Sequence, residues 1–197
     1  MNNWLLWTRF ILLNTIGFVG LTLLYINGYV DQVLTGDKSK ISVVIFTLFV
    51  VGLLIAASRI FKLSKEINLL KAGQSDRITE YTKLVELKNE ESARQAIEIT
   101  LLAKIQWIQY IASSLVSLGL IGTVYGTIVF MLGIDLSAIS DLERVGEVFG
   151  VVFNGMGIAL YTTLTGAVFN LWLKFNYAIV EHGTAHFLAG LISADLE

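Results

Sequence analysis

Two apolar stretches in the second half of the chain carry small, hydroxyl and amide side chains in place of acids and bases. They are residues 118–133 and 154–170, and neither contains a carboxylate or a basic side chain. Carrying a proton through a membrane generally requires a titratable side chain near mid-depth. These stretches alone therefore form a poor proton relay, and any proton carrier must come from a second polypeptide.

Small residues recur on one side of each stretch at helical spacing. Such residues allow helix backbones to approach closely, and hydroxyl groups can bond across the contact. Two interpretations remain open: plain helix packing, with Thr hydroxyls bonded to their own helix, or the lining of a seam or a partner helix. Asn170 favours the second, because an amide is costly to expose to lipid. The residues expected to pack the helices are Gly119, Gly122, Gly126, Gly155, Ala159 and Gly166.

The composition indicates a membrane protein. Of 197 residues, 55% are hydrophobic and 15% charged, whereas a soluble domain carries roughly 25% charged residues. The absence of Pro favours long uninterrupted helices. The absence of Cys excludes disulfides, thiolate metal sites and Cys nucleophiles, and no basic face argues for nucleic acid. No phosphate loop or nucleophile–base arrangement is present, so we expect neither an enzyme nor a cofactor.

We predict an all-α integral membrane protein with four transmembrane helices. The spans are expected at residues 4–26, 41–61, 107–132 and 148–175. Each is long enough to cross about 30 Å of hydrocarbon at 1.5 Å per residue.

The basic residues predict the orientation. Eight of them lie between the second and third expected spans, while the two short connections carry few. The positive-inside rule places this segment, and with it both termini, in the cytoplasm. The expected organisation is two transmembrane helices in 1–61, a cytoplasmic helical segment in 62–106, a pore-lining helix pair in 107–175 and a cytoplasmic C-terminal helix in 176–197.

Within 62–106 we expect amphipathic helices with a turn at Gly73, the second continuing unbroken into the third span. This segment is either a solvated connector or a docking site for a cytoplasmic partner. Ser140 and Glu143 form a capping-box pattern that predicts the start of the fourth helix. His182 and His186 are spaced i, i+4, but two ligands without a second cluster seldom hold a metal, so none is predicted.

Two motifs carry a family resemblance. The sequences GLIGTVYG (119–126) and GMGIALYTTLTG (155–166), separated by a short connection, resemble the paired signature of the MotA/TolQ/ExbB family. Members of that family are inner-membrane subunits of proton-driven motors. The expected four spans, with a cytoplasmic segment after the second, resemble the flagellar MotA layout more than the three-span TolQ and ExbB layout.

The resemblance implies a homopentamer around two single-span helices of a MotB/TolR/ExbD-like partner, whose membrane Asp carries the proton and which has a periplasmic domain. Thr123 and Thr163 match the family's pore threonines. Ile158 stands where ExbB and TolQ carry a Glu, so a role for that Glu does not transfer. The competing hypothesis is a self-assembling scaffold or simple channel without a motor partner. The residues expected to line the ion pathway are Thr123, Thr127, Thr162, Thr163 and Asn170.

Overall fold

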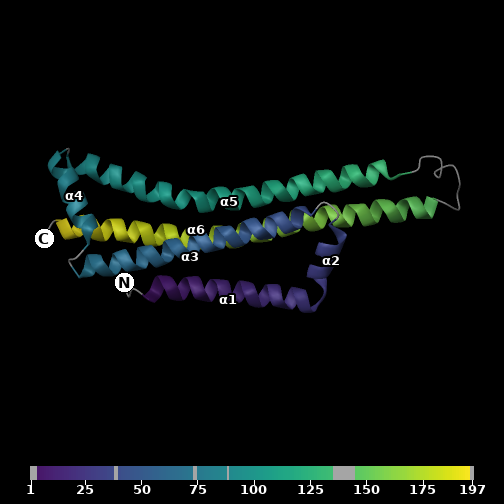
Figure 1. Ribbon diagram of the computed structural model, residues 1–197, viewed down its shortest axis with the longest axis horizontal. Coiled ribbons are helices and arrows are strands. Elements are labelled where there is room, and N and C mark those ends of the chain that lie inside the picture. The colour runs from purple at the N-terminus through teal and green to yellow at the C-terminus, as the bar shows by residue number, and fades with distance from the viewer. Residues whose placement is uncertain (1–3, 38–39, 73–74, 88, 135–144, 196–197) are drawn as a thin grey trace. The chain divides into compact units, whose positions relative to one another are not determined.

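All regular secondary structure in the described part of the chain is α-helical. A computed structural model describes residues 4–37, 40–72, 75–87, 89–134 and 145–195, and these ranges contain no strand. The predicted all-helical fold is therefore confirmed. The helices, labelled in Figure 1, are α1 (Trp4–Ile26), α2 (Tyr29–Gly36), α3 (Ile41–Lys71), α4 (Asp76–Leu87), α5 (Glu90–Leu132) and α6 (Val145–Asp195).

Four of these helices, α1, α3, α5 and α6, are long and apolar enough to cross a membrane. The predicted limits are accurate where a turn residue stops the apolar run. For example, α1 ends just before Gly28, which has the left-handed backbone angle φ of 76° that glycine adopts without strain. The capping box predicted at Ser140 and Glu143 lies outside the described residues.

The chain divides into two compact units. Unit 1 comprises Met1–Gly17, Val51–Tyr110 and Leu173–Glu197, and unit 2 comprises Phe18–Val50 and Ile111–Trp172. Each of the four long helices contributes one part to unit 1 and the other part to unit 2.

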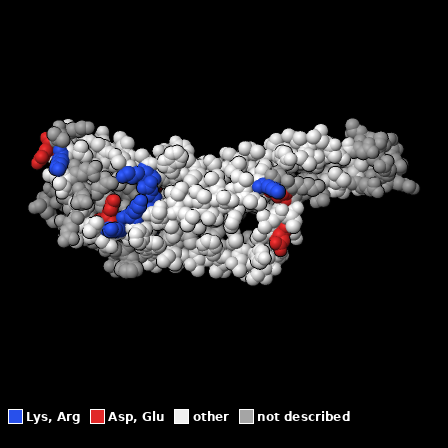
Figure 2. Space-filling model, in the orientation of Figure 1, with Lys and Arg blue, Asp and Glu red and all other residues white. Residues whose placement is uncertain are grey.

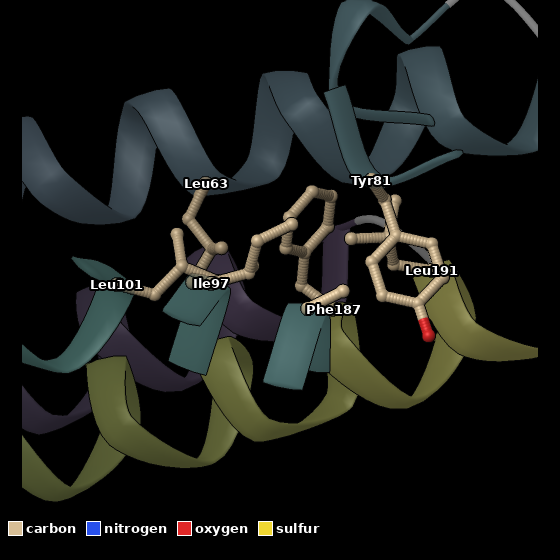
Figure 3. Close-up of a cluster of buried hydrophobic side chains, with 7 residues drawn as sticks. Leu63, Tyr81, Ile97, Leu101, Phe187 and Leu191 are labelled. Carbon is tan, nitrogen blue, oxygen red and sulfur yellow. The ribbon is translucent and has the colours of Figure 1, made fainter. Parts of the chain in front are cut away.

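Unit 1 is built around a cluster of buried hydrophobic side chains (Figure 3). Tyr81 brings α4 into this cluster and is only 1% exposed. The periodic apolar residues of the 62–106 segment thus pack against the end of α6. The cluster consists of Leu63, Tyr81, Ala93, Ile97, Leu101, Phe187 and Leu191.

The expectation that the second amphipathic helix runs unbroken into the third span is wrong. Helix α4 ends at Leu87 and α5 begins at Glu90. Asn89 caps the new helix, because its Oδ1 accepts a hydrogen bond from the Ser92 backbone N–H at 2.9 Å. Asparagine is among the residues preferred at this position, so Asn89 was the sequence signal that the prediction missed.

The connection between α1 and α3 contains a short helix, α2, that was not predicted. A buried carboxylate follows it: Asp37 is 7% exposed, and its Oδ2 accepts a hydrogen bond from the Ser42 N–H at 2.6 Å. This bond satisfies one of the free N–H groups in the first turn of α3.

A pair of buried amides joins α1 to α6 within unit 1. Asn14 Nδ2 donates to Asn176 Oδ1 at 2.8 Å, and Asn176 Nδ2 donates to Asn14 Oδ1 at 3.3 Å. Asn14 is 7% exposed and Asn176 is fully buried. Because a polar group within apolar helices must find a partner, this reciprocal pair sets the position of α1 along α6.

Replacing Asn14 with leucine should destabilise the protein, because it removes both hydrogen bonds between Asn14 and the buried Asn176 amide. We expect a loss of about 1–2 kcal/mol in unfolding free energy, measured by unfolding in detergent. The double replacement Asn14→Leu/Asn176→Leu should cost less than the sum of the single changes. Asn27→Leu is the control, because that amide is exposed and donates only to the nearby Leu23 carbonyl oxygen of α1. Additive effects of the two single changes would contradict the role of the pair.

Candidate functional site

Helices α5 and α6 pack against each other in opposite directions within unit 2. As residue numbers rise along α5, the numbers of the residues they contact on α6 fall. The successive contacts are Leu115 with Gly166, Gly119 with Thr163, Gly122 with Thr162, Gly126 with Ala159 and Phe130 with Gly155. All six predicted packing residues thus lie in this one contact.

The backbones approach so closely that side chains larger than hydrogen do not fit at several positions. A Cβ atom on Gly166 would lie 2.5 Å from the Leu115 carbonyl oxygen, and one on Gly119 would lie 3.0 Å from the Thr162 carbonyl oxygen. Contacts with backbone atoms cannot be relieved by rotating a side chain. The glycines are therefore required by the separation of α5 and α6, as expected for small residues between membrane helices.

Aromatic side chains cover α6 on the α1 and α3 side of unit 2. Phe49 stacks on Phe169 with ring centroids 4.4 Å apart, and Phe18 meets Trp172 edge-on at 5.3 Å. These large rings bury apolar area and have defined geometry. They leave the Gly/Thr side of α6 for contact with α5.

The hydroxyl groups of Thr123 and Thr163 hydrogen-bond to each other across the α5–α6 contact. Thr123 Oγ1 also lies 3.0 Å from the Ala159 carbonyl oxygen, and Thr163 Oγ1 lies 3.1 Å from the Gly119 carbonyl oxygen. Each hydroxyl has one proton to donate but two lone pairs to accept with. This group of oxygens, which we call the threonine cluster, thus offers more acceptors than donors.

The other predicted pathway residues lie in different surroundings. Thr162 is 1% exposed, and its hydroxyl donates to the Ala159 carbonyl oxygen at 2.8 Å, so it lies inside the helix contact. Thr127 donates to the Thr123 carbonyl oxygen of its own helix at 2.7 Å. Asn170 is half-buried, and its Oδ1 has no hydrogen-bond partner among the described residues. The structure therefore joins Thr123 to Thr163, with Thr162 beside them, and leaves Thr127 and Asn170 outside the cluster.

Tyr161 precedes Thr162 on α6, and its contact with α2 was missed from sequence. Its hydroxyl donates to Gln32 Oε1 of α2 at 3.4 Å. The amphipathic pattern of residues 29–36 could have predicted helix α2, and with it a surface for this contact.

The site contains no group that could carry a proton or hold a metal. No Asp, Glu, His, Lys or Arg occurs in residues 107–134 or 148–173. Among the described residues, no three or more His, Asp or Glu side chains lie close enough together to hold a metal ion. The cluster can accept and donate hydrogen bonds, but it needs a titratable partner to move protons.

The fold and the site define an all-helical membrane protein whose last two apolar helices form a Gly- and Thr-lined pair. A family model, the MotA/TolQ/ExbB proton channel family, matches residues 63–189. The match covers more than half of the chain and includes α4, α5 and most of α6. The chain therefore belongs to the MotA/TolQ/ExbB proton channel family, a family of channels rather than of enzymes. No curated protein and no solved structure gave a match.

Proposed function

We propose that this chain is the ring-forming subunit of a proton-driven rotary motor or energy-transducing complex in the bacterial inner membrane. The observation that carries the proposal is that the family match includes both helices of the threonine cluster. A proton channel family member without a titratable residue in this helix pair requires the carrier from elsewhere. The family works with a MotB/ExbD-like partner, which can supply it.

In the proposed assembly, five copies surround two single-span helices of a MotB/TolR/ExbD-like protein with a membrane Asp and a periplasmic domain. Helices α5 and α6 line the pore, with Thr123 and Thr163 facing the Asp. The half-buried state of both threonines supports this, because each is only partly covered by its own chain. We propose that Thr127 and Asn170 extend the pathway on either side. The burial of Thr162 favours packing as its main role.

The threonine cluster suits both protonation states of a carboxyl group. A protonated Asp can donate its O–H to a free acceptor of the cluster, whereas an ionised Asp can accept a bond from a Thr hydroxyl. Ionisation in an apolar medium is costly unless such bonds compensate it. The charged Asp is therefore held beside the threonines, while the neutral Asp is released to move past apolar surface. Proton transfer thus changes the preferred position of the partner helix, which is the required coupling.

The proposed orientation follows from the basic residues. Those in 62–106 indicate that this segment, which contains α4, lies in the cytoplasm, together with both termini and the end of α6 from residue 176 to residue 195. The helix pair in 107–175 then crosses the membrane with its connection on the periplasmic side. Residues 1–61 supply the remaining two spans.

Native mass spectrometry of this protein, co-expressed with the single-span protein encoded next to it, tests the assembly. We expect five copies of this chain bound to two copies of the partner. A stable homo-oligomer that does not bind the partner would exclude the motor hypothesis and favour a scaffold or simple channel.

A further inference from the structure

Unit 1 carries a concentration of positive charge beside apolar helix surface. Figure 2 shows Lys and Arg side chains gathered in a patch over the unit 1 end of α3, with Asp or Glu atoms at its edge. On α3, Arg59 is half-buried and Lys62 is exposed, and on α5 Lys104 is half-buried. All three belong to helices long and apolar enough to span a membrane.

Contacts within unit 1 place Arg59 and Lys104 at one level. Leu63 of α3 and Leu101 of α5 belong to the same buried cluster. Arg59 precedes Leu63 by four residues and Lys104 follows Leu101 by three, in both cases toward the end of the helix that enters unit 2. At 1.5 Å per residue, the two cations therefore lie about 4.5–6 Å beyond the leucines, on neighbouring helices.

Helix α1 carries a cation at the same level. Leu6 and Leu63 both contact Gly183, with side-chain carbons 2.9 Å and 2.8 Å from the position of a Cβ there. Arg9, three residues along α1 from Leu6, is exposed. Three helices therefore carry cations at one level along their axes. We interpret this level as a plane parallel to the membrane surface.

Apolar and aromatic side chains surround this plane. Trp7 and Phe61 meet edge-on at 6.1 Å between α1 and α3, and Trp107 and Tyr110 lie 6.1 Å apart on α5. Phe61 is 60% exposed and Trp107 is 65% exposed. Exposed aromatic rings beside cations are typical of the headgroup level of a bilayer, where a phosphate is the available anion.

The cations have no anionic partner within the described chain. No ion pair involves Arg59, Lys62 or Lys104 among the residues that the structure describes. A half-buried cation beside apolar surface is stabilised by an anion. We propose that Arg59, Lys62 and Lys104 form a binding site for the headgroup phosphate of an anionic phospholipid, whose acyl chains lie along the exposed apolar surface of α3 and α5.

Lipid retention tests this site with the intact chain. The protein is incorporated into vesicles of phosphatidylethanolamine and phosphatidylglycerol, extracted in mild detergent, and analysed for bound phosphatidylglycerol. Each Lys or Arg near the surface contributes about 1 kcal/mol, or about fivefold in affinity. Arg59→Gln/Lys104→Gln should therefore lower retention at least about fivefold. The charge-preserving variant Arg59→Lys/Lys104→Arg should retain the lipid, which separates charge from misfolding.

The matched control is Lys83→Gln/Arg94→Gln, which removes the same charges from exposed positions on α4 and α5. Retention equal to wild type in Arg59→Gln/Lys104→Gln, or an equal loss in the control, would overturn the proposal. Displacement of the lipid by millimolar inorganic phosphate would also overturn it, since the site would then take free phosphate. The test needs only this chain, so it is independent of the proposed motor and its partner.

Discussion

Replacing Thr163 with valine is expected to abolish proton-driven activity while leaving the assembly intact. Valine has nearly the shape of threonine but no hydroxyl, so the bonds to Thr123 and to the Gly119 carbonyl oxygen are lost. Leaving a partly buried acceptor without its hydrogen bond costs about 1–3 kcal/mol, and each 1.4 kcal/mol is about tenfold. Proton flux into proteoliposomes that contain this protein and its proposed partner should fall at least about tenfold.

Thr165→Val is the matched control. Thr165 lies two residues further along α6, is also half-buried, and donates to the Tyr161 carbonyl oxygen of its own helix at 2.8 Å. Its loss should leave flux within about twofold of wild type, because an intrahelical hydroxyl bond adds little. Unchanged flux in Thr163→Val, alongside an active wild type, would contradict the role of the threonine cluster. Failure of Thr163→Val to assemble would instead assign this hydroxyl to packing.

Replacing Gly166 with alanine is expected to force α5 and α6 apart. The added Cβ would lie 2.5 Å from the Leu115 carbonyl oxygen and 3.2 Å from Gly119 Cα. Both are backbone atoms, so the helices themselves must shift. Overpacking of this kind costs about 1–3 kcal/mol. We expect a lower unfolding midpoint in detergent and loss of the proposed oligomer on size-exclusion chromatography.

Gly157→Ala provides the comparison on the same helix. A Cβ at Gly157 meets nothing within 4 Å, and alanine favours the helix over glycine. This variant should therefore be as stable as wild type or slightly more stable. Equal behaviour of the two variants would show that the close α5–α6 approach is absent in the membrane.

The two replacements separate two functions of one helix. Thr163→Val should change flux without changing assembly, whereas Gly166→Ala should change assembly first. In a scaffold without a motor partner, Gly166→Ala would weaken assembly, whereas Thr163→Val would leave proton flux unchanged. The pair of experiments therefore distinguishes packing from ion transfer.

The sequence by itself determined the features that depend on local chemistry. Apolar runs without proline predict membrane helices at Trp4–Ile26 and at the start of α3, and both agree with the structure. The signature stretches 119–126 and 155–166 were sufficient to identify the family, which the match to residues 63–189 confirms. The roles of the threonines, by contrast, remain predictions. The preference of apolar side chains for lipid and the spacing of the helical repeat are properties of one segment. Both can therefore be predicted without knowledge of the segments that pack against it.

Only the tertiary structure decided which of these residues meet. Thr162 and Thr163 are adjacent in sequence, yet the first is buried against Gly122 while the second bonds to Thr123. Asn14 and Asn176 are 162 residues apart and form one buried pair. Such pairings depend on how one helix is rotated and shifted against another. The close glycine contacts set that arrangement for α5 and α6, and the asparagine pair sets it for α1 and α6. No single segment contains this information.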